Sequence, residues 1–333
     1  MQSFLSISGA RRTLGWALLL LIMACGTTSI YLTVTRPAEI NLSAYRKIVI
    51  GDIVDLDSKG GHHAADLADK ITEGLFASQA YEVLDRQNMV AILQEHSLGE
   101  SGLIDENTAP QIGQIIGSAA MVFGRIQVDS YTEEVTHQKP YTDKDGKTHE
   151  WQVRKGVYRL SATLKVIDVE TARILAVKTV SARRTATRRA DKKVPAKIDP
   201  EPLYVKCADD ITRQFIRMIA PYQVQVRAAF LTDKLLPEVD QAVGLFRIGE
   251  WEDGIAILDR SIRKKGLGSD VQSKAFYNLG LALIYTGQYD EAIEQLKTAL
   301  SLNPTSKRIQ STVLRAKEEK ANAEKLEEQK SEG

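Results

Sequence analysis

Hydrophobic and polar positions in the first half of the chain predict strands and helices in alternation. Residues 47–54 are mostly apolar, as in a buried strand. After them, apolar residues recur with helical spacing and form one face: Ala64, Leu67, Ala68, Ile71 and Leu75. A short β-type run at 81–84, two helical segments and a buried strand at 120–127 come next. This order predicts an α/β (α+β) domain in which helices flank a sheet.

A long β-hairpin is expected after this strand. Asp145-Gly146 is a strong turn signal, and the two arms would run out from Ile126 and back to Ile167. Along the returning arm one face is apolar, with Tyr158, Leu160, Ala162, Leu164 and Val166. A further strand at 173–180 and a helix at 203–220 complete the predicted domain, and Cys207 in that helix is expected to be a small buried residue.

The second half of the chain has helical periodicity throughout, beginning with an expected helix around 224–231. Residues 273–306 match the 34-residue tetratricopeptide pattern where it needs aromatic, small or helix-breaking residues: Phe276, Leu279, Gly280, Gly287, Tyr289, Ala292, Leu296, Ala299 and Pro304. A divergent copy is expected at 235–268, where Gly249-Glu250-Trp251 parallels Gly287-Gln288-Tyr289. Two repeats are fewer than the roughly three that usually fold alone. The helix before them and the tail after them are therefore expected to act as caps.

The start of the chain predicts its compartment. Arg11 and Arg12 precede an apolar run at 14–24 that is too short to cross a bilayer, which is typical of a secretory signal. Residues 22–25, Ile-Met-Ala-Cys, resemble a bacterial lipobox, in which Cys25 becomes the acylated first residue of the mature chain. The alternative is an ordinary signal peptide that is cut nearby. Because Gly26 rather than Asp follows Cys25, the pattern resembles that of lipoproteins released to the outer membrane. We expect a lipid-anchored periplasmic protein.

These signals divide the chain into five expected parts. They are a lipoprotein signal peptide (1–24), a tether (25–40), an α/β domain (41–222), a repeat region (223–310) and a charged helical or disordered tail (311–333). The net charge of +1 falls to −1 without the signal peptide, so nothing in the overall charge favours nucleic acid as a partner. If Cys25 carries lipid, Cys207 is the only cysteine left and no intrachain disulfide can form.

The order of features between residues 81 and 127 resembles a known family. A strand closes on Asp85-Arg86, and Gln94-Glu95 stands near the end of a helix. A loop, a turn and the last residue of a strand follow at Gly102 to Asp105, Gly117-Ser118 and Gly124. Together these features resemble the CsgG-like family, the lipoproteins of curli production, assembly and transport and their relatives in the bacterial envelope. The chain departs from the family at residues 117–120, Gly-Ser-Ala-Ala, where Gly-Ala-Asp is usual. The resemblance extends over residues 48–219.

In the curli secretion channels of this family, two excursions become membrane-spanning hairpins of an oligomeric pore. The first excursion here, residues 128–138, has no apolar face on either side. The second carries Arg183, Arg184, Arg188, Arg189, Lys192, Lys193 and Lys197. An Arg or Lys side chain at the bilayer midplane costs roughly 2–4 kcal/mol. Both excursions are therefore expected in the periplasm, and a secretion-pore subunit is kept as an alternative.

The basic run allows two interpretations. Arg183, Arg184, Arg188 and Arg189 could contact an anionic surface: phosphate-bearing lipid head groups, lipopolysaccharide or an acidic partner. The alternative is a mobile loop that its charge keeps soluble. Nucleic acid is not expected, since no aromatic residue lies within the run.

Tetratricopeptide repeats bind proteins, and the resemblance implies which residues line the concave surface. They are Lys274, Tyr277, Asn278, Leu281 and Ile284. Lys274 and Asn278 could hold a carboxylate or the backbone of an extended peptide. The alternative is packing against the neighbouring repeat, which we favour for Leu281 and Ile284.

Signatures of catalysis and metal binding are missing from the sequence. The chain contains no G-x-S-x-G elbow, no phosphate-binding G-x-x-x-x-G-K-[ST] loop and no G-x-G-x-x-G fingerprint. His62 and His63 lie near Asp55 and Asp57, but without the spacing of a metal site, so a solvated loop is expected there. We expect no catalytic residue, no metal and no cofactor apart from covalent lipid on Cys25.

The sequence as a whole predicts a non-catalytic, outer-membrane-anchored periplasmic lipoprotein. It would act in assembly or export of a cell-surface structure by binding envelope or secretion-system proteins through its repeat region. Two alternatives remain: a lipoprotein activator of a peptidoglycan synthase, and a subunit of an oligomeric secretion pore. Homo-oligomerisation is left open.

Overall fold

The computed structural model describes residues 26–55, 62–84 and 117–331. It divides into two compact units, which are considered separately. The sheet unit comprises residues 31–226 and 315–333, and the helical unit comprises residues 1–30 and 227–314. Within the described ranges, no helix is both long enough and apolar enough to span a membrane.

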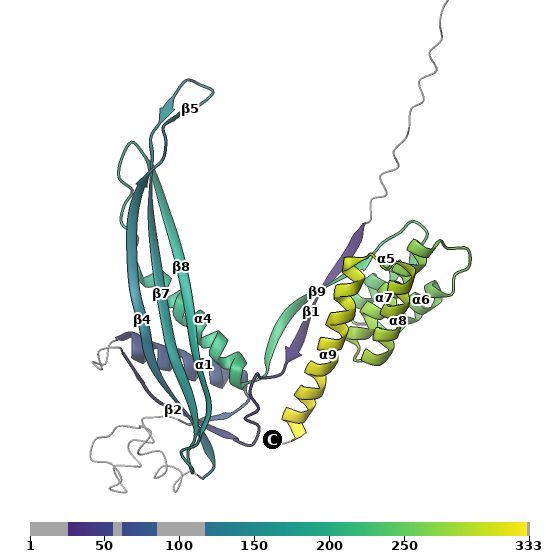
Figure 1. The fold of residues 1–333 in the computed structure, drawn as a ribbon, viewed down its shortest axis with the longest axis horizontal. Helices are drawn as coiled ribbons and strands as arrows, with labels where there is room; N and C mark the ends of the chain where they lie inside the picture. The colour runs from purple at the N-terminus through teal and green to yellow at the C-terminus, as the bar shows by residue number, and fades with distance from the viewer. Residues whose placement is uncertain (1–25, 56–61, 85–116, 332–333) are drawn as a thin grey trace, which may run out of the picture. The chain divides into compact units, whose positions relative to one another are not determined.

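The sheet unit is built on a mixed five-stranded sheet with the strand order β3-β2-β4-β7-β8. The strands are β2 (Lys47–Val54), β3 (Glu82–Leu84), β4 (Ala119–His137), β7 (Trp151–Asp168) and β8 (Ile174–Asp191). β2 pairs in parallel with β3 and β4, whereas β4, β7 and β8 are antiparallel. These three strands are long and lie side by side (Figure 1).

Two helices, α1 (His62–Ser78) and α4 (Glu201–Ile219), pack on one face of this sheet. The predicted apolar face of α1 is confirmed: Ala64, Leu67, Ile71 and Leu75 are buried, while Ala68 is half-buried. The predicted apolar face of β7 is buried against the helices as well, from Tyr158 to Val166. The α/β prediction of a sheet flanked by helices is therefore confirmed, with the core between sheet and helices.

The predicted hairpin is formed by β4 and β7, whose register runs from Ala120 opposite Asp168 to His137 opposite Gln152. At its tip, β5 (Tyr141–Thr142) pairs with β6 (Thr148–His149). The chain turns through Gly146, which has a φ of 79°. Glycine adopts this left-handed conformation without steric cost.

The prediction of a mobile loop over the basic run, residues 183–197, is wrong for residues 183–191. β8 continues to Asp191 and pairs with β7 as far as Trp151. The charge of the run suggested a loop, but regular pairing with the long returning arm of the hairpin extends the strand. The Thr residues between the arginines, Thr185 and Thr187, favour this extended conformation.

The helical unit contains α5 (Glu238–Arg247), α6 (Trp251–Ile262), α7 (Ser269–Tyr285), α8 (Tyr289–Leu302) and the start of α9 (Lys307–Ser331). Helices α7 and α8 are the two helices of the predicted full repeat. They pack so closely that a Cβ atom on Gly280 would lie 2.7 Å from Leu296 Cγ and 3.0 Å from the Ala292 carbonyl oxygen. The small residues of the repeat pattern are therefore a requirement of helix packing.

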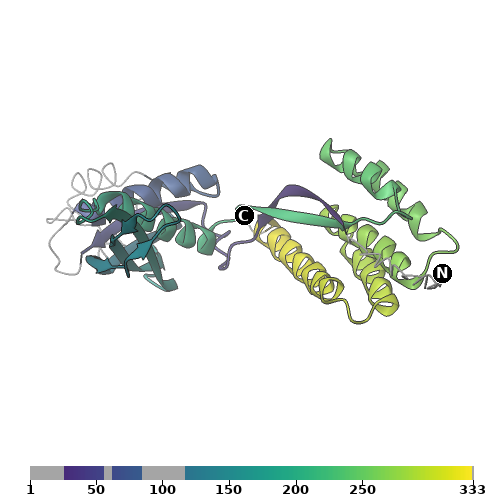
Figure 2. The same cartoon turned by 90° about the horizontal axis from the view of Figure 1, so that it is seen from above.

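Two predictions about the segments that flank these domains are wrong. Part of the expected tether forms β1 (Thr27–Arg36), and the expected helix at 224–231 lies in β9 (Tyr222–Leu231). The two strands form a separate sheet and lie side by side in Figures 1 and 2. Both segments are rich in β-branched and aromatic residues, but their pairing joins parts of the chain that are far apart in sequence, which a local pattern cannot reveal.

Candidate functional site

The repeat residue Asn278 binds a strand of its own chain. Its Oδ1 atom accepts a hydrogen bond from the Leu231 N–H at 2.7 Å, and its Nδ2 atom donates to the Leu231 carbonyl oxygen at 2.8 Å. Asn278 is completely buried on α7, and Leu231 is the last residue of β9. One side-chain amide thus satisfies both backbone groups of Leu231, as a neighbouring strand would.

Two further residues of α7 bind the same segment, residues 229–233. The Lys274 ammonium lies 3.0 Å from Asp233 Oδ2 and 2.8 Å from Asp270 Oδ2, and its side chain is 8% exposed. The Tyr277 hydroxyl donates to the Ala229 carbonyl oxygen at 3.1 Å. The Leu235 N–H and, after it, Lys274 hold the pKa of Asp233 below its usual range. Segment 229–233 is therefore held by side chains spaced along one helix.

The structure thus places the predicted partner-binding residues against their own chain. Lys274 binds a carboxylate and Asn278 binds an extended backbone, as expected for a bound peptide, but the peptide is segment 229–233. Leu281 and Ile284 are buried in the helical unit. This contact could not be predicted from the sequence because residues 224–231 were expected to be helical.

The four predicted arginines are all exposed, and β8 distributes them over both faces of the sheet. Arg184 forms an ion pair with Asp210 of α4, so Arg184 and Arg188 lie on the face that the helices cover. Arg183 and Arg189 lie on the opposite face, where the Arg189 guanidinium is 5.6 Å from the centre of the Trp151 ring. Consecutive arginines therefore point in opposite directions.

Arg183 stands directly opposite Arg159 of β7. Like charges in opposite positions of neighbouring strands are destabilising. Within the part of the chain that the structure describes, neither guanidinium forms an ion pair or a hydrogen bond. This face of the sheet thus keeps positive charge that an anionic partner could neutralise.

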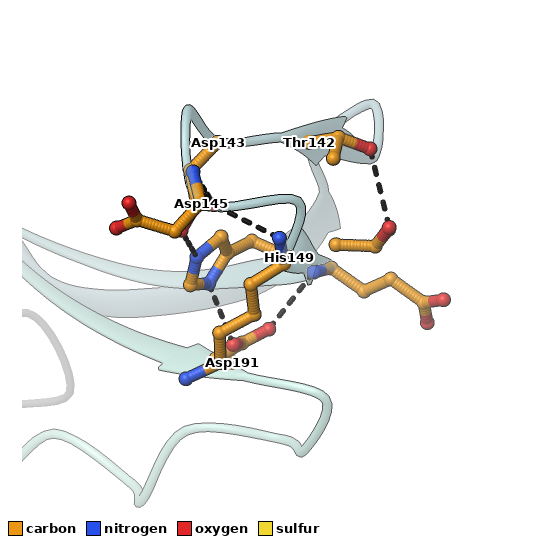
Figure 3. Close-up of polar contacts among 8 residues, drawn as sticks. Thr142, Asp143, Asp145, His149 and Asp191 are labelled. Carbon is orange, nitrogen blue, oxygen red and sulfur yellow. Dashed lines mark hydrogen bonds and ion pairs between the residues drawn. The ribbon is translucent and has the colours of Figure 1, made fainter.

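A polar cluster closes the hairpin tip (Figure 3). His149 Nε2 lies 3.0 Å from Asp143 Oδ2, and His149 Nδ1 lies 2.9 Å from Asp191 Oδ2. The bonds to Asp143 and then Asp191 raise the pKa of His149. The bond to His149 lowers the pKa of Asp143, while the Glu150 N–H and His149 lower that of Asp191. The cluster ties the turn to the end of β8.

A second polar network fixes the segment that follows β8. Glu133 Oε2 accepts hydrogen bonds from the Ile198 N–H at 3.0 Å and the Tyr131 hydroxyl at 2.7 Å, and Glu133 also pairs with Arg154. The Arg154 Nε atom donates to the Pro195 carbonyl oxygen at 2.8 Å. These bonds, led by the one from Ile198, lower the pKa of Glu133 to about 2. Nothing in the sequence indicated this network.

The expected solvated loop at the histidine pair is partly wrong. His62 and His63 begin α1, His63 Nδ1 lies 2.6 Å from Asp129 Oδ2, and the His63 ring stacks on Tyr204 with 3.7 Å between ring centres. Over the described ranges, no group of three or more His, Cys, Asp or Glu residues is placed to hold a metal ion.

Of the two cysteines, the structure describes Cys207 but not Cys25. Cys25 lies outside the described residues, so its acylation stays a prediction. Cys207 is a buried free cysteine, as expected. Burial raises the pKa of its thiol. A buried, protonated thiol is a poor nucleophile.

Comparisons with known proteins agree with the two predicted domains. A family model described as curli production assembly/transport component CsgG matches residues 58–194, and a tetratricopeptide repeat model matches residues 273–306. A search of curated proteins finds no match.

Solved structures resemble the chain only distantly. Lipoprotein GNA1162 from Neisseria meningitidis is 11% identical, with 42% of this chain and 81% of that chain covered and a TM-score of 0.28. The LpoB C-terminal domain from Escherichia coli is 10% identical, covering 41% and 82%, with a TM-score of 0.28. The PelC dodecamer from Paraburkholderia phytofirmans is 12% identical, covering 58% and 99%, with a TM-score of 0.27. Scores this low carry no argument about function. The two family matches, together with the fold, show that this chain contains a CsgG-like domain followed by a tetratricopeptide repeat.

Proposed function

We propose that this protein is a non-catalytic lipoprotein of the bacterial envelope that acts in assembly or export of a cell-surface structure. One observation carries the proposal: a CsgG-like region and a tetratricopeptide repeat occur in one chain, after a sequence that resembles a lipobox. Cys25 would carry a covalent lipid that anchors the protein to the outer membrane from the periplasmic side. Its partners are other envelope or secretion-system proteins.

The geometry of α7 supports protein binding by the repeat region. Lys274, Tyr277 and Asn278 hold segment 229–233 through one carboxylate and the backbone of two residues. Backbone contacts of this kind depend little on sequence, so an extended peptide with an acidic residue could make them equally well. We propose that a partner peptide competes with segment 229–233 for these three residues.

Loosening the internal segment tests this competition. An Asp233→Ala variant removes the carboxylate through which Lys274 binds segment 229–233, while the Lys274–Asp270 ion pair within α7 is kept. If a partner uses the same surface, the variant should capture several-fold more of it from a crosslinked periplasmic extract than the unmodified chain does. Asp253→Ala, at an exposed position of α6, is the matched control. Unchanged or weaker capture, with a folded helical unit, would show that the contact is purely structural.

Two other functions predict different partners and assemblies. An activator of a peptidoglycan synthase should co-purify with that enzyme. A secretion-pore subunit should form a stable ring in detergent and conduct ions in bilayers. Purification as a monomer or dimer without conductance would exclude the pore.

A further inference from the structure

We propose that the free edge of β8 is a docking site for an acidic segment of a partner protein, which binds there in an extended conformation as an added strand. This surface lies wholly within the sheet unit and is separate from the repeat region. The proposal therefore goes beyond the function proposed above and can fail independently of it.

The first argument is the position of β8. It is the last strand in the order β3-β2-β4-β7-β8, so its second side is unpaired over the described part of the chain. An edge strand presents a row of backbone N–H and carbonyl groups to an incoming strand. At 18 residues β8 is also far longer than the other edge strand, β3, which has 3.

Two hydrogen bonds show which residues of β8 face outward. Ser161 of β7 donates to the Val180 carbonyl oxygen at 3.2 Å, whereas Gln214 of α4 donates to the Ser181 carbonyl oxygen at 3.3 Å. The backbone carbonyl of Val180 thus points toward β7, and that of Ser181 points away from β7. The N–H and carbonyl of one residue point to the same side of an antiparallel strand. By this alternation Arg183, Thr185, Thr187 and Arg189 present their backbone groups to the open edge.

The second argument is charge. Within its length β8 carries one acidic residue, Asp191, against the basic set Lys178, Arg183, Arg184, Arg188 and Arg189. Asp191 is bound by His149, and of the arginines only Arg184 is paired with an acidic residue in the described chain, Asp210. The free edge of β8 is therefore basic from Arg183 to Arg189, and this charge favours an acidic strand as its partner.

The same charge excludes a second copy of β8 as the occupant. Pairing of two β8 edges would place arginines of one copy beside arginines of the other, and like charges in neighbouring strands are destabilising. Charged side chains on an edge are a known protection against self-association of sheets.

The faces of β8 also define the pattern of the partner segment. Arg183 and Arg189 lie on one face of the sheet, and Arg184 and Arg188 lie on the other. Side chains of an incoming strand alternate between the same two faces. A segment that satisfies both faces must therefore carry acidic residues at both odd and even positions. A lipid surface or free phosphate would need the charge alone and not the backbone edge.

Binding of a short synthetic peptide of Glu and Thr to the full chain, followed by fluorescence anisotropy, tests the proposal. The Thr187→Pro variant keeps every charge but removes one outward N–H, so its affinity should fall roughly tenfold or more. The matched Thr187→Val variant keeps that N–H and should bind normally. An Arg183→Ser, Arg189→Ser double variant should also lose affinity, and circular dichroism reports whether each variant is folded.

A peptide of the same sequence that is N-methylated at every second residue separates strand addition from charge attraction. It should bind at least tenfold more weakly than the unmodified peptide. Equal binding of the two peptides, or equal binding by the Thr187→Pro variant, would overturn the proposal. Vesicles of phosphatidylglycerol form the third arm. Binding to vesicles that depends on the arginines, without any binding of the peptide, would assign the surface to lipid head groups instead.

Discussion

Asn278 binds both backbone groups of Leu231, and this single side chain joins α7 to the end of β9. The sheet unit contains the same arrangement. The Gln329 side chain of α9 accepts a hydrogen bond from the Ala38 N–H at 3.0 Å and donates to the Ala38 carbonyl oxygen at 3.0 Å. In both units a buried side-chain amide takes the place of a neighbouring strand.

Removal of the Asn278 amide should destabilise the helical unit. In Asn278→Ala the buried N–H and carbonyl of Leu231 lose their partner, which should lower the free energy of unfolding by about 1–3 kcal/mol. Urea denaturation followed by circular dichroism measures this change. Lys297→Ala, at an exposed position of α8, is the control and should change stability by less than about 0.5 kcal/mol. Equal stability of Asn278→Ala and the control would contradict the role of this amide.

Two glycines in the helical unit should respond to alanine in opposite directions. A Cβ at Gly280 would lie 2.7 Å from Leu296 Cγ and 3.0 Å from a backbone oxygen, so Gly280→Ala should cost about 1–3 kcal/mol. A Cβ at Gly244 in α5 would meet no atom within 4 Å, so Gly244→Ala should stabilise the unit by about 0.4–1 kcal/mol. Thermal unfolding of both variants compares them directly. A stabilising effect of Gly280→Ala would mean that α7 and α8 are not closely packed.

The Glu133 network should weaken in acid. The pKa of Glu133 is lowered from its ordinary 4.5 to about 2, first by the bond from Ile198 and then by that from Tyr131. A carboxyl group whose pKa is lowered by folding stabilises the folded state at pH values above its pKa in the unfolded chain. This stabilisation is lost as the pH falls from about 4.5 toward 2. Hydrogen exchange of the Ile198 amide should therefore speed up over that range. In Glu133→Gln the exchange should be fast already at neutral pH, whereas Glu134→Gln, at an exposed neighbour, should leave it slow.

The hairpin tip should lose order both when the pH is raised and when it is lowered. The raised pKa of His149 contributes stability below its ordinary value of 6.5, and this contribution is lost as the pH rises through the raised value. The pKa values of Asp143 and Asp191 are lowered, so the two carboxylates stabilise the tip above pH 3.8, their ordinary pKa. This stabilisation is lost in more acidic solution. The tip should thus be most ordered between about pH 4 and 6.5. An NMR titration of the His149 ring in the unmodified chain and in Asp191→Asn measures this, and an unchanged pKa in the variant would refute the contact.

Local periodicity revealed much of the fold. The apolar faces of α1 and β7 and the glycine turn at the hairpin tip follow from residues close together in sequence, and all were predicted. The pairing of β1 with β9 was not, because each strand is stabilised by a partner that lies far away along the chain. The charge of residues 183–189 suggested a loop because its pairing with β7 cannot be read locally.

For two candidate residues the sequence indicated which chemical groups they bind but not which part of the molecule supplies them. Lys274 and Asn278 do hold a carboxylate and an extended backbone, yet the sequence could not show that residues 229–233 supply both. One of the two interpretations let the four arginines contact a single anionic surface, whereas strand alternation divides them between two faces. The Glu133 and His149 clusters depend on contacts between residues far apart in the sequence, Glu133 with Ile198 and His149 with Asp191, so no spacing rule could find them.

Identification of partners in intact cells tests the central proposal most directly. Proteins crosslinked to the native chain are compared with those crosslinked to a Cys25→Ala variant expressed at the same level. We predict secretion or surface-appendage proteins among the partners of the native chain and their loss from the Cys25→Ala variant. Peptidoglycan synthases in their place, or a partner set that is the same with and without Cys25, would contradict a role of this anchored protein in the assembly or export of a surface structure.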